Sequence, residues 1–443
     1  MKMKNISIWK DLKIKKDYSK LNKDIKCDVL IIGGGITGVS TLYHLRDTKL
    51  KVVLVEQNKI GQGVTGNSTG KLSYLQNDLI DKIRNNNEED AVCYLKTQID
   101  AIDMLVKTIE KEKIRCDLEE VESILYTNKD DEIEMIKSLE NFLRKNEINV
   151  SVINNDIVQS KYMIKSSNTY LFHPIKFLYG LIKNSEDVYE NTRIIKIEKS
   201  NDYYKCYTNN NIIMCKYVVI ASHYPYFILP YLFPLKCYLE KSYLSVSKSN
   251  YKDLSLISYS NPFVSIRTYK NNLIYLSNSH EIGTRVNDKD NFKELIKKIS
   301  DLNLTANYLW SNIDIMTGDG MPYIGKIKNN MLIGTGYNTW GLANGFLAGK
   351  ILSDIILNKD NKYIDLFNPK RKIKGILGNI QKNISGYISG ITSDTKKCKL
   401  CPHAYGKLIY NDIEDTWDCP CHGSRFDKNG KCISGPANKD VDV

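Results

Sequence analysis

The sequence predicts a combined α/β and α+β fold with a small C-terminal lobe, and three stretches of the chain predict it. The first is a glycine turn between two apolar segments within residues 27–56. The second is an apolar segment, a glycine-rich turn and a helical pattern within residues 318–357. The third is a group of cysteines and histidines within residues 398–443. Strand, turn and helix in succession are typical of α/β folds, and the alternating strands of residues 170–310 add an α+β part.

The first stretch has the pattern of a βαβ unit, with strands expected at residues 29–32 and 52–55. Three glycines between these strands are spaced G-x-G-x-x-G: Gly33, Gly35 and Gly38. This spacing lets the backbone turn tightly and approach a pyrophosphate, which the helix N-terminus favours. Glu56 follows 18 residues after Gly38, close to the ~20 expected of a carboxylate that binds a ribose hydroxyl. We interpret the unit as a dinucleotide site; the motif leaves NAD and FAD open, and a plain glycine turn is the alternative.

Composition indicates an ordinary globular protein of 443 residues, with 42% hydrophobic and 26% charged residues. The longest apolar run, residues 217–235, contains three prolines, which argues against an integral membrane segment. Residues 1–26 and 369–397 carry the whole net charge of +12. We interpret these basic segments as solvated surface or as a surface that steers an acidic partner. Nucleic-acid binding is not expected, because the sequence has no aromatic-interleaved basic groove.

Cysteines fall into two groups. Of the 11 cysteines, five lie in the last 46 residues and six are scattered without a pairing pattern. Scattered thiols of this kind are typical of a reducing compartment, so we expect a cytoplasmic location.

The middle of the chain mixes helices and strands. Apolar residues recur at helical steps within residues 91–109, so helix is expected across residues 78–150. A helix beginning at Pro174 precedes several strands. Further on, residues 264–279 predict a hairpin. We expect this hairpin to bring Arg267 and His280 to one face as candidate substrate residues, although a lone Arg or His on a strand is usually structural.

Two further stretches lie toward the end of the chain. Residues 331–357 predict a strand, a second glycine turn that includes Gly336 and Gly341, and a helix whose N-terminus is a second anion site. Residues 373–391 show helical apolar spacing that is diluted by glycines. A connector helix is favoured there, with a membrane-surface helix as the alternative.

The terminal cluster consists of Cys401-Pro-His403 and, 15 residues later, Cys419-Pro-Cys-His422. Two thiolates on one iron and two imidazoles on the other are the ligands of a Rieske [2Fe–2S] cluster. Zinc is the competing interpretation, because Cys398 and Cys401 are spaced as in a zinc ribbon. Ser424 and a Gly-Pro-Ala loop after the second motif favour the iron–sulfur interpretation.

Together these motifs resemble the flavoprotein oxidoreductases of the D-amino-acid oxidase and glycine oxidase type that carry a C-terminal Rieske domain. The resemblance covers nearly the whole chain and rests on IIGGGITG, GVTGNSTGKLS, FHPIKFLYGL, VVIASHYP, GDGMPYIG, GYNTWGLANG, CPH and WDCPCHGSRF. It implies FAD rather than NAD, a discontinuous Rossmann-type FAD domain and an interposed substrate domain on a mixed sheet. The expected parts are a basic N-terminal arm (1–26), the FAD domain (27–78, 150–224 and 311–369), the substrate domain (79–149 and 225–310), a connector helix (370–397) and a short Rieske lobe (398–443).

The resemblance also implies site residues. It places the ADP half of FAD on the first glycine motif, the isoalloxazine near residues 61–73, and the pyrimidine edge at Trp340. The implied cofactor-binding residues are Gly33, Gly35, Ile36, Thr37, Gly38, Glu56, Gly63, Thr65, Gly66, Lys71, Ser222, Gly336, Trp340, Gly341 and Leu342. The implied cluster ligands are Cys401, His403, Cys419 and His422. Gly406 stands where many Rieske proteins have a cysteine, so Cys421 lacks the usual disulfide partner.

The resulting hypothesis is an FAD-dependent dehydrogenase of an amine or amino-acid-like donor, which passes electrons through the cluster to a soluble, acidic carrier. Arg267 would pair with a substrate carboxylate and His280 or Tyr243 would orient it, with Trp340 at the flavin. A reductase that runs electrons inward is one alternative. A redox-sensing protein without turnover is another, and an unmetallated lobe on a working oxidase is a third.

Overall fold

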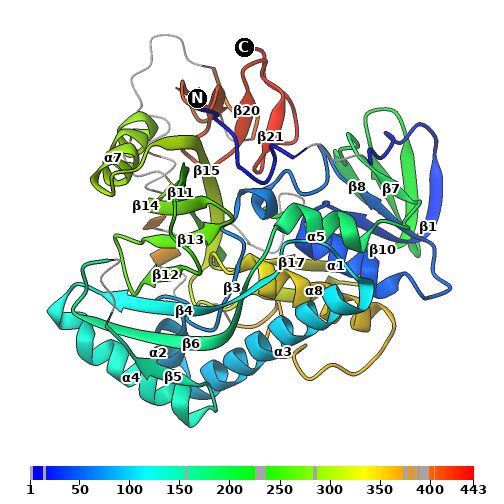
Figure 1. The fold of residues 1–443 in the computed structure, drawn as a ribbon. Helices are drawn as coiled ribbons and strands as arrows, with labels where there is room; N and C mark the ends of the chain where they lie inside the picture. The colour runs from blue at the N-terminus through cyan, green and yellow to red at the C-terminus, as the bar shows by residue number, and fades with distance from the viewer. Residues whose placement is uncertain are drawn as a thin grey trace.

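The computed structural model describes residues 3–12, 16–154, 158–224, 236–282, 287–372, 378, 379, 381, 382, 384, 388, 399–403 and 405–443. Three sheets organise this part of the chain. Figure 1 shows the C-terminal lobe, in red, above the junction of the other two sheets. The predicted connector helix, residues 370–397, lies largely outside the described residues.

The first sheet contains the predicted βαβ unit, and its strand order is β16-β17-β10-β1-β2-β7. β1 pairs in parallel with both β10 and β2, and its apolar residues 29–32 are almost completely buried. The strands are β1 (Ile25–Ile32), β2 (Val52–Val55), β7 (Val188–Tyr189), β8 (Lys196–Ser200), β9 (Tyr203–Tyr207), β10 (Ile212–Ile220), β16 (Tyr323–Lys328) and β17 (Met331–Thr335). The predicted strands at residues 29–32 and 52–55 are confirmed.

Helices α1 (Ile36–Leu45) and α8 (Gly341–Ile356) begin at the two predicted glycine turns. They pack so closely that a Cβ at Gly349 would lie 2.3 Å from Ser40 Oγ, which is why glycine is needed there. The neighbouring helices are α2 (Leu79–Asn86), α3 (Glu88–Glu112) and α5 (Pro174–Leu181). The helix predicted to begin at Pro174 is confirmed.

The second sheet is mixed, as expected for the interposed domain, and its order is β15-β11-β14-β13-β12-β4-β6-β3. β12 runs parallel to β4, whereas the other pairs are antiparallel. The strands are β3 (Lys71–Leu72), β4 (Glu119–Thr127), β5 (Val150–Val152), β6 (Tyr162–Leu171), β11 (Cys237–Lys248), β12 (Ser255–Ser258), β13 (Ser265–Tyr269), β14 (Asn272–Glu281) and β15 (Ala306–Thr317). Helices α4 (Ile133–Lys145) and α7 (Asp288–Asp301) complete this part.

Two expectations differ from this arrangement. Continuous helix across residues 78–150 is wrong, because β4 lies inside that range and pairs on both sides with β12 and β6. β5, β6 and β15 overlap segments assigned to the FAD domain, yet they pair in the second sheet. An alternating pattern identifies a strand but not its partner, because pairing is decided between residues far apart in sequence.

The remaining parts pack onto this frame. The C-terminal sheet consists of β18 (Ile409–Asn411), β19 (Thr416–Asp418), β20 (Arg425–Asp427) and β21 (Cys432–Ser434). The N-terminal arm is more than solvated surface, because Trp9 is fully buried and its Nε1 donates to Ser68 O at 2.7 Å. Among the described residues, no helix combines the length and the apolar character needed to cross a membrane.

Candidate functional site

A cavity of about 440 Å³ lies where the three sheets meet, and residues from each of them line it. Gly33, directly after β1, forms part of its wall with a backbone φ of +115°. A Cβ at this position would lie 2.5 Å from Ala221 O, so the turn requires glycine. The N-terminus of α1 borders the same cavity, which fits the phosphates of a dinucleotide.

Most of the predicted cofactor residues line this cavity: Gly33, Gly35, Ile36, Thr37, Glu56, Gly63, Thr65, Lys71, Ser222, Trp340, Gly341 and Leu342. The other three, Gly38, Gly66 and Gly336, do not line it and instead allow close packing behind the wall. A Cβ at Gly38 would lie 1.9 Å from Gly33 O, and one at Gly66 would lie 2.1 Å from Gly61 O. These glycines therefore shape the loops and do not face the cavity.

Glu56 is held in place at the end of β2. Its Oε2 accepts from the Gly34 amide at 2.7 Å, and its Oε1 accepts from the Asn58 amide at 2.8 Å. Burial raises the pKa of this carboxyl in spite of these bonds. Thr65 Oγ1 accepts from the Ile36 main-chain amide at 3.1 Å. This bond connects the loop of residues 61–73, which is expected near the isoalloxazine, to the start of α1.

Arg267 does not lie where a substrate carboxylate could meet it. Its side chain is fully buried and does not line the cavity. Its Nη1 donates to the carbonyls of Thr69, Gly70 and Phe172 at 3.0, 2.6 and 3.2 Å. Burial lowers the pKa of this guanidinium to about 9. Arg267 is thus an anchor for the loop before β3, which corrects its predicted role in substrate binding.

His280 is also distant from Arg267, contrary to expectation. The strand register pairs Arg267 with Ile274, six residues before His280, which is roughly 20 Å along the strand. His280 instead meets Tyr243, whose hydroxyl lies 3.1 Å from Nε2 and also donates to Asp288. Neither Tyr243 nor His280 lines the cavity, so the geometry does not support a substrate-orienting role for them.

The four predicted cluster ligands converge at one end of the lobe. The rings of His403 and His422 lie 5.1 Å apart at 89°, and the thiols of Cys401 and Cys419 are within hydrogen-bonding distance of each other. The Nδ1 atoms of both histidines are buried, which suits metal ligation. The Ser424 hydroxyl reaches the Cys401 thiol, as expected for a donor toward the cluster sulfur.

The described donor set matches the ligand count of a Rieske cluster. Within the described part of the chain, no three His, Cys, Asp or Glu side chains converge tightly enough to hold one metal ion; Cys398, named for the zinc alternative, lies outside it. A structural zinc site needs four ligands on one ion, whereas each iron of a Rieske cluster takes only two from the protein. The arrangement therefore fits two thiolates on one iron and two imidazoles on the other.

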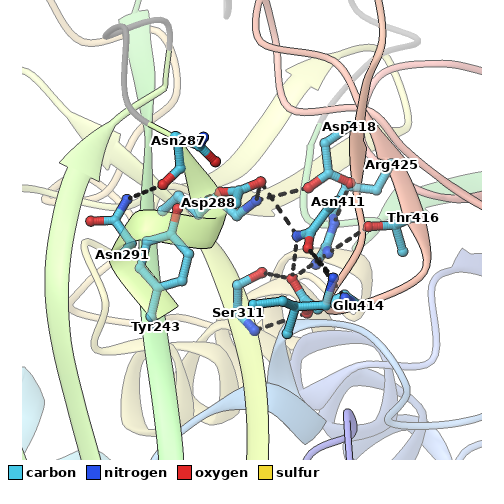
Figure 2. A network of polar contacts seen from close by, with 12 residues as sticks. Tyr243, Asn287, Asp288, Asn291, Ser311, Asn411, Glu414, Thr416, Asp418 and Arg425 are labelled. Atoms are coloured by element: carbon cyan, nitrogen blue, oxygen red, sulfur yellow. Dashed lines mark hydrogen bonds and ion pairs between the residues drawn. The ribbon is translucent and has the colours of Figure 1, made fainter. Parts of the chain in front are cut away.

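A buried polar network attaches this lobe to the second sheet (Figure 2). Arg425 donates to Glu414 at 2.7 Å and to Asp418 at 3.1 Å, and Glu414 accepts from the Ser311 amide at 2.9 Å. Lys241 of β11 donates to Asp418 at 2.7 Å. Burial opposes ionisation of Asp418, but Arg425 and Lys241 outweigh it and hold the pKa of that carboxyl well below its usual range. The short lobe is thus held against the second sheet by buried charged groups.

The lobe also forms a wall of the central cavity. His422, a predicted cluster ligand, lines the cavity together with Gly423. Elsewhere along this interface, the side chains of Gln57 and Asn58 each donate to Ile433 O at 3.1 Å, next to the predicted ribose carboxylate. The cluster end of the lobe therefore belongs to the predicted flavin site, which no local sequence pattern indicated.

Several other cavity residues had no local sequence signal. Glu240, Asn312 and Asp314 line the cavity from β11 and β15, and Lys10 reaches it from the N-terminal arm. Their strands are recognisable by alternation, but the face that each strand turns toward the cavity depends on long-range register.

Comparisons with known proteins agree with this geometry. The family model described as FAD dependent oxidoreductase (DAO) matches residues 28–355, and the Rieske [2Fe-2S] domain model matches residues 398–443. The chain is 28% identical to the Rieske 2Fe-2S iron-sulfur protein YhfW of Bacillus subtilis, with 97% of this chain and 96% of that protein covered. It is 23% identical to gamma-glutamylputrescine oxidoreductase of Escherichia coli, over 79% of this chain and 88% of that protein.

Among solved structures, glycine oxidase from Geobacillus kaustophilus superposes with a TM-score of 0.67 at 17% identity, covering 79% of this chain and 100% of that one. L-proline dehydrogenase from P. horikoshii gives a TM-score of 0.66 at 17% identity, covering 79% of this chain and 98% of that one. These two likenesses concern the fold. Since the DAO model spans most of its length, the chain belongs to the DAO family of FAD-dependent oxidoreductases, and it carries a C-terminal Rieske [2Fe–2S] domain.

Proposed function

We propose that this oxidoreductase oxidises an amine or amino-acid-like donor and passes the electrons through its Rieske cluster to an external soluble carrier. The observation that carries the proposal is the shared cavity, in which the glycine loop of the FAD domain and His422 of the Rieske lobe face the same space. Two comparisons support an amine donor, because the names gamma-glutamylputrescine oxidoreductase and glycine oxidase both refer to amino compounds.

FAD, when bound, supplies a hydride acceptor that can also release electrons one at a time, which suits it to connect an amine donor with a one-electron cluster. The residues of the chain position the two centres. Gly33 and Glu56 line the cavity where the ADP half is expected, and Trp340 lines it at the start of α8, where the isoalloxazine is expected. Cys401 and Cys419 would hold one iron, while His403 and His422 would hold the other.

The network around Asp418 and Glu414 keeps the lobe against the second sheet. Lys241 and Arg425 are both nearly buried and both bonded to carboxylates. Breaking such a buried pair is costly, because it leaves an uncompensated charge. The cluster is therefore expected to stay at the cavity wall during turnover, so that electron transfer needs no movement of the lobe.

Anaerobic titration tests this function. Protein purified with FAD and cluster is mixed with a panel of amines and amino acids, while flavin absorption and the low-temperature EPR spectrum are recorded. We expect a donor to bleach the flavin and then to produce the signal of a reduced Rieske cluster. Bleaching by none of the panel would contradict amine oxidation. Flavin reduction by a pre-reduced carrier alone would instead favour inward electron flow.

A variant tests the cluster ligand. His422→Cys should move the EPR signal toward that of a ferredoxin-type cluster, if His422 binds iron. An unchanged Rieske signal would show that His422 is not a ligand. Protein that contains zinc and no iron would remove the electron-relay part of the proposal.

A further inference from the structure

Two carboxylates of the second sheet face the central cavity side by side. Glu240 on β11 and Asp314 on β15 are direct partners in the antiparallel register. Directly opposed residues of such a pair project from one face of the sheet with Cβ atoms about 5 Å apart. Both line the cavity. Burial raises the pKa of Asp314 most, and the nearby charge of Glu240 raises it further.

An amide completes this group. Asn312 lies two residues before Asp314 on the same strand, so it shares that face of the sheet. It lines the cavity and is only 5% exposed. Its Nδ2 donates to Asp314 Oδ2 at 3.0 Å, while its buried Oδ1 has no hydrogen-bond partner in the described part of the chain. A buried acceptor of this kind is costly unless a donor reaches it.

In the described part of the chain, the cations nearest to Glu240 lie outside the cavity. Two lysines, Lys382 and Lys82, act on Glu240 from outside the cavity and lower its pKa, but burial and neighbouring carboxylates outweigh them. Lys382 pairs with Glu281 at 2.5 Å, and Lys82 donates to a main-chain carbonyl at 2.9 Å. Three acceptors therefore share one part of the cavity, and the described residues that line this part add no balancing positive charge.

Most of the described basic residues that line the cavity are bonded to other groups. Lys71 donates to a main-chain carbonyl at 2.6 Å, Arg193 pairs with Asp440 at 2.9 Å, and Arg425 donates to Glu414 at 2.7 Å. Lys10 lies between the loop and the lobe: its Cε is 3.2 Å from the position of a Cβ at Gly66, and its charge interacts with Arg425 and Glu414. A ligand bound beside Glu240 and Asp314 would therefore have to supply the positive charge itself.

The acidic group adjoins the segment expected to meet the flavin. The main-chain amide of Asn338 donates to the carbonyl of Ile315 at 3.1 Å, and Ile315 directly follows Asp314 in the chain. Trp340 follows two residues after Asn338 and also lines the cavity. A group bound at Asp314 would thus lie beside the expected ring of the cofactor and not at its ADP end.

We propose that Glu240, Asp314 and the Oδ1 of Asn312 form a subsite for a protonated amine, so that the donor is recognised by an ammonium group and not by a carboxylate. An ammonium has three N–H donors and one positive charge, and it matches three acceptors with an excess of negative charge. The proposal rests on the proposed function and narrows its substrate class to cationic amines. In this proposal the acidic subsite recognises the donor. Arg267 does not, because its side chain does not line the cavity.

A pair of ligands with the same shape and opposite charge tests the subsite without turnover. tert-Butylammonium has no C–H next to nitrogen and cannot be oxidised at that position, and pivalate is its carboxylate counterpart. Each is titrated into the oxidised, FAD-loaded protein, and binding is followed by the change in flavin absorption and by equilibrium dialysis. We expect tert-butylammonium to bind at least tenfold more tightly than pivalate.

Variants assign the binding to the residues. Asp314→Asn and Glu240→Gln should each weaken tert-butylammonium at least tenfold, while FAD content stays unchanged. Asp202→Asn removes one negative charge from the exposed turn between β8 and β9 and should have no effect. Tighter binding of pivalate, absence of tert-butylammonium binding, or binding that neither variant weakens would overturn the subsite.

The outcomes also separate this proposal from the proposed function. If tert-butylammonium binds as expected but no amine or amino acid bleaches the flavin, the subsite stands and the oxidation of amines fails. If amino acids bleach the flavin while pivalate is the tighter ligand, amine oxidation stands and the ammonium subsite fails.

Discussion

Lys241 Nζ on β11 of the second sheet donates to Asp418 Oδ2 on β19 of the Rieske lobe at 2.7 Å. Lys241 is 4% exposed. Burial alone would lower its pKa, but Asp418 and Asp288 outweigh this effect and raise it. The charge pair therefore joins two parts of the chain that lie far apart in sequence, and it does so where both charges are removed from water.

Replacement of this lysine should loosen the lobe. Lys241→Met leaves buried carboxylates without one of their cations, and breaking a buried pair costs about 3–5 kcal/mol. We expect earlier loss of the cluster signal in urea and slower electron transfer from flavin to cluster in stopped-flow experiments. Lys293→Met is the matched control, because its pair with Asp290 is exposed and such pairs contribute about 0–1 kcal/mol. Equal stability of the two variants would contradict docking by Lys241.

Gly406 faces the thiol of Cys421, and this contact predicts a new disulfide. A Cβ at residue 406 would lie 3.4 Å from the Cβ of Cys421 and 2.4 Å from its sulfur, close to the Cβ separation of natural disulfides. Gly406→Cys should therefore form a disulfide in air, and closing a loop of about 15 residues should stabilise the lobe by about 3 kcal/mol. Mass spectrometry and thermal unfolding with and without reductant measure this.

Gly406→Ser controls for the added Cβ. It places a side chain against the same thiol without the means to bond it, so it should lower the melting temperature in both conditions. If Gly406→Cys behaves like Gly406→Ser in air, the two positions are not aligned for a disulfide.

Arg267 should matter for stability and not for carboxylate recognition. Arg267→Met removes the donor that the carbonyls of Thr69, Gly70 and Phe172 share. Gly70 O keeps the main-chain amide of Phe172 at 3.1 Å, and each buried acceptor that is left unsatisfied costs about 1–3 kcal/mol. We expect a lower free energy of unfolding in urea and reduced FAD content. Arg115→Met, at an exposed position, should change stability by less than about 0.5 kcal/mol. A stable Arg267→Met protein whose KM rises only for carboxylate donors would contradict this assignment.

Binding of an ammonium ligand should strengthen as the pH rises through about 7. Burial and then Glu240 raise the pKa of Asp314 to about 7, and the bond from Asn312 lowers it only in part. Asp314 is thus neutral below this pH and attracts a cation above it, while tert-butylammonium stays charged throughout. The charged groups around its partner Glu240 are Glu281, Asp78, Lys382 and Lys82.

The Kd of tert-butylammonium should be measured between pH 5.5 and 8.5. It should fall by at most about tenfold per pH unit up to pH 7 and then level off, because binding of the cation is linked to the release of one proton from Asp314. Asp314→Asn should flatten this profile, and Asp202→Asn should preserve it. A profile that stays steep in Asp314→Asn would assign the proton to another group.

Local features of the sequence indicated both predicted cofactor sites. The glycine turn of Gly33, Gly35 and Gly38, the carboxylate of Glu56 and the Cys/His spacing of residues 401–422 are local features, because a turn or a ligand loop is built from residues close together in the chain. Twelve of the fifteen cofactor residues that the family resemblance implied line the cavity. Local alternation likewise identified the β13–β14 hairpin, which is confirmed.

The surroundings of those sites depend on contacts that the folded chain alone reveals. The sequence favoured Arg267 as a substrate residue, yet its strand turns this side chain to buried carbonyls, whereas β11 and β15 turn Glu240 and Asp314 to the cavity. No local pattern of the sequence indicated that His422 lines the central cavity. A one-residue change of register reverses the face of every side chain on a strand. Register and docking are set by contacts between distant segments, so a local pattern identifies a strand or a ligand motif but not what it faces.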